Sequence, residues 1–87
     1  MNEIVFYDKK NVIYKNLRDL RKKRGLSQGQ LAAKLQVMNV NITQQIISRI
    51  EHNTRIVTEY ELACLCRALG VTEREMLSDF YEQYPDQ

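Results

Sequence analysis

The stretch "ITQQIISRIEHNTR", residues 42–55, has the pattern of a short amphipathic helix with one apolar side and one polar side. At about 100° per residue, its isoleucines fall in one arc of the helix, and its longer polar side chains fall in the opposite arc. The apolar arc contains Ile46, Ile47 and Ile50. The polar arc contains Gln44, Gln45, Ser48, Arg49 and His52. We therefore expect one side to be anchored in a core and the other to remain open to a partner.

The open side carries side chains that suit contact with base pairs. Glutamine can bond bidentately to adenine N6 and N7 in a major groove, and each such contact discriminates between bases by roughly 1 to 3 kcal/mol. Gln44 and Gln45 lie in the first turn, where side chains project beyond the scaffold. Arg49, one turn further on, suits guanine or a phosphate, and Ser48 suits either. An ordinary amphipathic surface helix has the same pattern, so the rest of the chain must decide between the two interpretations.

A helix is predicted ahead of this stretch, from about Asp8 or Asn11 to Arg24. Its apolar side chains recur on one stripe, at Ile13, Leu17 and Leu20. Gly25 follows, and glycine is typical of the left-handed residue that ends a helix.

A second helix is predicted to begin at the capping box of residues 27–30, where Ser and Gln are spaced to satisfy each other's backbone amides. It runs through Val37 or Met38. A turn at 39–41 follows, and Ile42 is the hydrophobic residue expected before the cap of the next helix.

Two more helices are predicted after the quoted stretch, beginning at the caps Thr58 and Thr72. The first ends at Gly70, and Pro85 lies beyond the end of the second. The last helix is expected to turn three apolar side chains to the core, those of Met76, Leu77 and Phe80. Five short helices with local contacts predict a compact all-α domain.

Charge is distributed unevenly along the chain, although the formal net charge is only +2. Residues 9–55 carry eleven basic side chains against Asp19 and Glu51, a net charge of +9. Residues 56–87 have a net charge of −5, and residues 1–8 add −2. A segment this positive attracts a polyanion, and the acidic end would be repelled by one. Solvated helix faces also produce such runs, so the asymmetry by itself is only suggestive.

Composition excludes several classes of protein. The chain has 87 residues, which suffices for one domain with a modest core. No apolar run approaches the roughly 20 residues that span a bilayer, and no export signal is evident, so a cytoplasmic location is expected.

Cys64 and Cys66 are expected to be buried free thiols. We find no paired carboxylates, metal cluster or nucleophile with a base, so we expect no enzyme, metal or cofactor. His52 is interpreted as a polar residue at a helix end or a neighbour of a phosphate.

The chain resembles the Cro and repressor-type (XRE-family) helix-turn-helix transcription regulators of bacteria and phages over residues 16–77. Three ordered motifs carry the resemblance: Leu-Ser-Gln at 26–28, Ile-Ser-Arg-Ile-Glu at 47–51 and Ala-Leu-Gly-Val at 68–71. The resemblance implies a compact five-helix lambda-repressor-like DNA-binding domain over residues 9–84, with the helix-turn-helix at about 27–52. Base edges would be read by Gln44, Gln45, Ser48 and Arg49. Phosphates would be held by Gln28, Thr43, Asn53 and Arg55.

One segment departs from the family pattern. The family usually joins its second and third helices by a tight turn, whereas "QVMNVNI" at 36–42 is longer. A longer connector affects the angle at which the next helix enters a groove. A related helical domain that does not bind DNA therefore stays open as an alternative.

We expect a sequence-specific double-stranded DNA-binding transcription regulator, a repressor, that works as a homodimer. A dimer is expected because one helix that reads a few base pairs gives limited affinity. Two partners related by two-fold symmetry, about 34 Å apart, would read a palindrome on one face of the duplex. The alternative is a protein-interaction module, such as an antitoxin or adaptor, that uses the acidic C-terminal half. Four aromatic side chains either complete the core or form a dimer contact, and both roles stay open. They are Tyr7, Phe80, Tyr81 and Tyr84. Three stay open for residues 1–8: an arm, an edge strand, or packing for the last helix.

Overall fold

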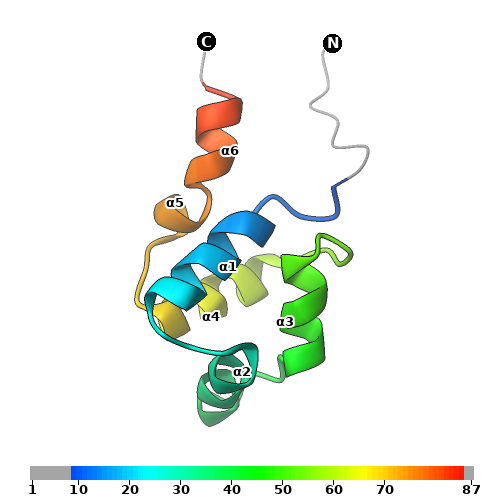
Figure 1. Cartoon of the computed structure of the whole chain (residues 1–87), viewed down its shortest axis with the longest axis vertical. Coiled ribbons are helices and arrows are strands. Elements are labelled where there is room, and N and C mark those ends of the chain that lie inside the picture. Colours follow the sequence, from blue (N-terminus) through cyan, green and yellow to red (C-terminus); the bar gives the residue numbers. More distant parts are fainter. Residues whose placement is uncertain (1–8, 86–87) are drawn as a thin grey trace.

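In the computed structural model, which describes residues 9–85, the chain folds into an all-helical domain (Figure 1). The helices are α1 (Tyr14–Lys23), α2 (Gln28–Val37), α3 (Gln44–Glu51), α4 (Glu59–Leu69), α5 (Glu73–Met76) and α6 (Ser78–Gln83). The predicted all-α class is confirmed. The apolar stripes of α1 to α5 meet in one core, and its fully buried members include Leu17, Leu31, Leu35, Ile47, Ile50, Leu65 and Met76. Burial of these side chains is the main force that holds the short helices together.

Four helices end in the same hydrogen-bonded arrangement around a left-handed residue. Gly25, Asn39, Asn53 and Gly70 have φ values of 72°, 62°, 59° and 68°. After α3, for example, Asn53 N–H donates to the Ile50 carbonyl at 3.0 Å, and Thr54 N–H donates to the Arg49 carbonyl at 2.9 Å. This pattern is the Schellman motif, which satisfies the last carbonyls of a helix and turns the chain sharply. The predicted stops at Gly25 and Gly70 are confirmed.

Four helices begin at a hydroxyl cap, as predicted. The hydroxyls of Ser27, Thr43, Thr58 and Thr72 each accept a hydrogen bond from the backbone N–H three residues later. Full capping boxes form at residues 27–30, 58–61 and 72–75. Each cap satisfies a backbone donor that the first turn cannot pair internally, which fixes where the helix starts.

The start of α1 differs from the prediction, because the helix begins at Tyr14 and not at Asn11. Asn11 is buried, and its Nδ2 donates to the carbonyls of Ile50 and Arg55, both at 3.0 Å. Its Oδ1 accepts from Ile13 N–H at 3.1 Å. These bonds hold residues 9–13 in a non-helical path across the end of α3. The other predicted start, Asp8, lies outside the described residues.

The connector between α2 and α3 is ordered as predicted. Helix α2 continues to Val37, Met38 caps it, and the left-handed Asn39 turns the chain. Ile42, only 2% exposed, enters the core directly before the Thr43 cap. A buried residue in this place fixes the direction in which a helix starts. The longer connector therefore holds the start of α3 firmly.

The predicted single last helix is divided in two at Leu77, so the expected count of five helices is wrong. Leu77 ends α5 and precedes α6. Asn16 of α1 donates through Nδ2 to the Met76 carbonyl at 3.0 Å and lies 3.1 Å from the Ser78 hydroxyl. Because this amide bonds groups on both sides of the junction, it holds the bend, and α6 points away from the other helices (Figure 1).

The aromatic side chains of α6 form a small cluster at the surface. The Phe80 ring lies 5.4 Å from the Tyr81 ring and 5.3 Å from the Tyr84 ring, between centroids. Tyr81 is 47% exposed and Tyr84 39% exposed, so core packing is wrong for these two. Phe80 is half-buried. A dimer contact through this cluster stays a prediction, and Tyr7 lies outside the described residues.

Both cysteines are free thiols, in agreement with the sequence interpretation. Cys66 is buried in the core, whereas Cys64 is half-buried. Burial, with the nearby charges of Glu73 and Glu75, raises the pKa of the Cys66 thiol to about 11. The thiol therefore stays protonated at neutral pH and acts as a small apolar side chain.

The left-handed turn at Asn39 gives a direct test of the connector. We expect Asn39→Ala to lower the free energy of unfolding by about 1 kcal/mol, because alanine tolerates positive φ poorly. The matched variant Asn39→Gly should be neutral or slightly stabilising, since glycine adopts this conformation without strain. Urea denaturation of both variants measures the difference. Equal stability of the two variants would show that the turn does not require this conformation.

Candidate DNA-binding surface

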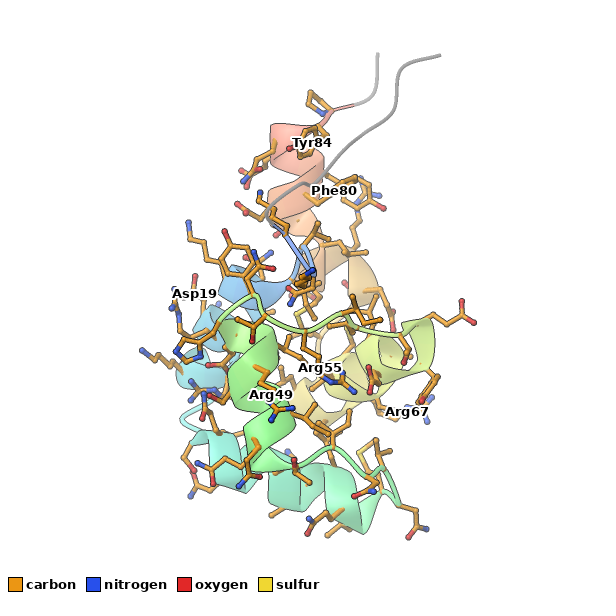
Figure 2. The ribbon with its side chains drawn as sticks, turned by 90° about the vertical axis from the view of Figure 1, so that its right-hand side faces the viewer. Asp19, Arg49, Arg55, Arg67, Phe80 and Tyr84 are labelled. Atoms are coloured by element: carbon orange, nitrogen blue, oxygen red, sulfur yellow. The ribbon has the colours of Figure 1, made fainter. Side chains whose placement is uncertain are left out.

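Helix α3 has one buried side and one open side, as the sequence predicts. Ile47 and Ile50 are fully buried, whereas Gln44, Gln45 and Arg49 are exposed. Figure 2 shows Arg49 on the outer side of α3. Ser48 and Thr43 are half-buried, and the Thr43 hydroxyl accepts from Ile46 N–H at 3.3 Å. The structure therefore brings all four predicted base-reading side chains to one outward surface.

Gln44 lies against the start of α2. A Cβ placed on Gly29 would be 3.5 Å from Gln44 Oε1, an ordinary van der Waals distance. The carboxamide of Gln44 thus occupies space that a longer side chain at position 29 would compete for. The beginnings of α2 and α3 are consequently close together, as required if both are to face one partner.

The end of α3 is held by a buried carboxylate. Glu51 is 4% exposed and accepts from Arg21 of α1, with Nε at 2.7 Å and Nη2 at 2.9 Å. Gln28 of α2 also donates to it through Nε2 at 3.1 Å. Arg21 makes a further bond through Nη1 to the Leu26 carbonyl at 2.8 Å. One carboxylate therefore joins the three helices that form the surface.

The ionisation of Glu51 depends on these partners. Burial disfavours its carboxylate, but hydrogen bonds from Arg21 and Gln28 more than offset that cost and place the pKa of Glu51 below its ordinary value. The hydrogen bond to Glu51 raises the pKa of Arg21. The positive charge of Arg18 also lowers the pKa of Glu51, so Arg18 contributes to the field at the end of α3. Both members of the pair are therefore charged at neutral pH.

Gln28, a predicted phosphate contact, belongs to this network. The residue is half-buried, and one of its amide hydrogens is directed to Glu51. An amide nitrogen carries two hydrogens, so the second is still available to a ligand. A phosphate contact by Gln28 stays a prediction.

Arg55, another predicted phosphate contact, is paired within the protein. Its Nη1 and Nη2 donate to Glu61 Oε1 and Oε2 at 2.9 and 3.0 Å, and Nη1 also donates to the Ile56 carbonyl. Figure 2 shows Arg55 between α3 and α4. The bonds from Arg55 lower the pKa of the buried Glu61 despite the opposing effect of burial. The charge of Arg55 is therefore already balanced, and its phosphate contact also stays a prediction.

Asn53, also a predicted phosphate contact, has a positive φ of 59°. Its Oδ1 accepts from Lys10 N–H at 2.9 Å and from Asn11 N–H at 3.1 Å. Asn53 thus joins the segment ahead of α1 to the turn after α3.

Close by, His52 Nδ1 lies 2.7 Å from the Ser48 carbonyl oxygen, a contact that requires a proton on Nδ1. His52 is exposed and caps the end of the helix, as expected.

Sequence reasoning missed the structural roles of Asn11 and Arg21, and it missed the pairing of Glu61 with Arg55. A signal for Arg21 was present, because it lies four residues after Leu17 and so falls on the apolar stripe of α1. A charged residue on such a stripe needs a buried partner of opposite charge. The pairing with Glu51, thirty residues away, could not be read from spacing.

Basic side chains are exposed on the elements that precede α3 in the chain. They occur on the segment ahead of α1, on α1 and on α2, and include Lys10, Lys15, Arg18, Lys22, Lys23 and Lys34. Arg49 adds a positive charge on α3 itself. Exposed cations together with the amide groups of α3 suit a negatively charged partner with a patterned face.

Comparison with known families agrees with this geometry. A family model described as helix-turn-helix matches residues 17–76, most of the described domain. The chain belongs to the Cro/repressor-type (XRE) helix-turn-helix family. At the level of the family it is a DNA-binding regulator, and the family is typically non-enzymatic. The resemblance drawn from the three sequence motifs is therefore confirmed.

No curated protein matches the chain. Within residues 9–85 of this helix-turn-helix protein, none of the helices combines the length and the apolar character needed to cross a membrane.

The buried pair can be tested by removing one partner and then both. We expect Glu51→Leu to lower the free energy of unfolding by about 3 to 5 kcal/mol, because Arg21 would remain charged and unpaired in the core. The double variant Arg21→Met/Glu51→Leu should recover much of that loss, since it leaves no buried charge. Urea denaturation provides both values. The single variant Arg21→Met completes the set. A double variant whose loss of unfolding free energy equals the summed losses of Glu51→Leu and Arg21→Met would contradict this account.

Acid should weaken the fold through the same carboxylates. The pKa values of Glu51 and Glu61 are lowered from the ordinary 4.5, so their contribution is complete above that pH and is lost as the pH falls through the folded-state values. We expect the urea midpoint to fall on acidification below about pH 4.5. In Glu51→Gln this loss should be smaller, because position 51 no longer titrates. An unchanged pH profile in Glu51→Gln would contradict the assignment.

Proposed function

We propose that the protein is a sequence-specific double-stranded DNA-binding transcription regulator that acts as a repressor. In this proposal, α3 enters the major groove and reads base edges with Gln44, Gln45, Ser48 and Arg49. The observation that carries it is the division of α3, in which Ile47 and Ile50 are fully buried while the amides of Gln44 and Gln45 and the guanidinium of Arg49 are exposed. An anchored helix presents these groups at a fixed angle, so they are preorganised for base contacts.

The flanking residues support the same docking. Thr43 and Gln28 lie at the starts of α3 and α2, where backbone amides and polar side chains can hold phosphates. Asn53 and Arg55 lie at the other end of α3, and we keep them as the phosphate contacts on that side. Their bonds within the protein give them a second role, because they fix the turn that would approach the backbone.

Charge orients the molecule toward DNA. Exposed cations on α1 and α2 attract the phosphate backbone, whereas the acidic C-terminal part is repelled and faces away. A cytoplasmic location fits a regulator that must reach DNA.

Affinity favours a homodimer. A single helix reads only a few base pairs, whereas two copies of α3 about one helical turn apart read two half-sites on one face of the duplex. The exposed Tyr81 and Tyr84 on α6 are candidates for the contact, since tyrosine is enriched in interfaces. A bound dimer would repress by occluding an operator from other proteins.

A second candidate function is a protein-interaction module, such as an antitoxin or adaptor. The exposed aromatic cluster on α6, within the acidic C-terminal part, favours it. This role uses a different surface from α3, so it is compatible with DNA binding. A protein partner that co-purifies with a chain indifferent to DNA would favour this candidate over the regulator.

Alanine substitution on the open side of α3 tests base reading. We expect Gln44→Ala and Gln45→Ala each to reduce discrimination at particular base pairs by about 1 to 3 kcal/mol without loss of stability. The matched control Gln36→Ala removes an exposed glutamine of α2 and should change neither property. Binding to a set of duplexes that differ at single positions measures the effect.

The salt dependence of the same measurements separates base contacts from phosphate contacts. We expect the logarithm of affinity to fall linearly with the logarithm of salt concentration, with a slope of about −0.9 for each phosphate neutralised. Gln44→Ala should leave this slope unchanged, because a neutral side chain releases no counterion. Unchanged base preference in both glutamine variants would show that α3 does not read sequence.

A further inference from the structure

A groove lies on the molecule between the segment ahead of α1, the start of α4 and the bend between α5 and α6. Its volume is about 350 Å³. It is lined by residues 9–13, by residues 57–59, and by Leu62 and Leu77. None of the side chains assigned above to base reading or phosphate contact lines it, and Lys10 is the one exposed cation named above that does. The groove is therefore distinct from the open side of α3.

The inner lining of the groove is apolar. Val12, Val57, Leu62 and Leu77 are half-buried and pack against the core, and Ile13 is 3% exposed. Together they leave a strip of apolar surface that is partly open to solvent. Covering apolar surface of this kind with a further apolar side chain is favourable, because it removes that surface from water.

The rim of the groove is charged and asymmetric. Lys9 and Lys10 lie on the side from which the chain enters, and Glu59 lies at the start of α4. Lys9 is the first described residue. The preceding eight residues, which lie outside the described part of the chain, are therefore attached directly at the rim.

Those eight residues have the composition that such a groove would accept. Their sequence is "MNEIVFYD", with four consecutive apolar or aromatic residues at 4–7 between Glu3 and Asp8. Their net charge of −2 complements the two lysines of the rim. Phe6 lies three positions before Lys9, a reach of up to about 10 Å.

We propose that residues 4–7 dock into this groove of their own chain, with the Phe6 side chain against Leu62 and Leu77. A short tether supplies an effective concentration in the millimolar range, so a modest apolar contact suffices to keep the segment bound. Glu3 and Asp8 then lie where the charges of Lys9 and Lys10 favour them. Three roles were left open for residues 1–8, and the proposal selects the third, packing against the end of the chain. It adds a contact with Leu62, near the start of α4.

Docking would support the end of α3 indirectly. The segment at 9–13 carries Asn11, which bonds the carbonyls of Ile50 and Arg55, and it is held by Asn53. An occupied groove would hold this segment from the other side. The proposal concerns packing and stability, and it does not depend on whether the protein binds DNA.

A double-mutant cycle in the full chain tests the proposal. The variants are Phe6→Ala, Leu62→Ala and the two together, and the readout is the unfolding equilibrium constant from urea denaturation. We expect Phe6→Ala alone to raise that constant about tenfold, as for loss of a partly buried aromatic side chain. In the Leu62→Ala background its effect should be about threefold or less, because the contact is already weakened.

Tyr60→Ala provides the matched control background. Tyr60 is on the same helix as Leu62, is 65% exposed and does not line the groove. Phe6→Ala should have its full effect in this background. Equal effects of Phe6→Ala in the Leu62→Ala, Tyr60→Ala and unsubstituted chains would overturn the proposal, as would no effect in any of them.

Two further measurements identify the occupant. The methyl resonances of Leu62 and Leu77 should shift in Phe6→Ala, because the ring current of Phe6 is lost, while those of Leu26 should not. The change in urea midpoint caused by Phe6→Ala should be the same at every protein concentration, as expected for docking within one chain. An effect of Phe6→Ala that grows with concentration would show that the segment of a second copy fills the groove, and unshifted methyls would show that the segment lies elsewhere. Either result overturns the proposal.

Discussion

The buried carboxylate of Glu51 is the constraint on which the rest of the structure depends. It stands at the end of α3 and is bonded by Arg21 of α1 and Gln28 of α2, so the three helices that build the surface share one charged centre. A charge removed from water requires partners in correct geometry, and α1 and α2 together supply them to Glu51. We infer that this network selects one orientation of α3 from those that the core would allow.

Around that centre, α3 is held by contacts at both ends. Thr43 and the buried Ile42 fix its beginning, and Asn53, with the segment that carries Asn11, fixes its last turn. The polar groups that hold the helix face inward or sideways. The outward face is left to Gln44, Gln45 and Arg49, which the scaffold does not need. Structural polar groups and exposed polar groups are therefore separated on this helix.

Much of the fold could be predicted from the sequence, because its signals are local. Hydroxyl caps, capping boxes and left-handed residues specify where helices begin and end, and Asn53, Gly25 and Gly70 behave as their chemistry requires. The spacing of the isoleucines at helical periodicity was enough to predict which side of α3 is buried and which is exposed. Two features depended on distant residues and could not be predicted in this way. Asn11 bonds the end of α3, which keeps its segment out of α1, and Asn16 bonds both sides of the bend at Leu77. In both cases a side-chain bond across the fold overrides the local helical preference. The pairing of Arg55 with Glu61 spans only six residues, but it depends on the turn between α3 and α4, which helical spacing does not describe.

The central claim is that the open face of α3 reads base pairs in double-stranded DNA. Selection of bound duplexes from a random pool with the purified full chain tests it most directly, because the result reports sequence, spacing and symmetry together. The account predicts enrichment of a motif with two-fold symmetry, with half-sites about 10 base pairs apart between centres and with adenine prominent among the selected positions. Recovery of a pool as random as the one supplied, under salt conditions in which the protein remains folded, would contradict it.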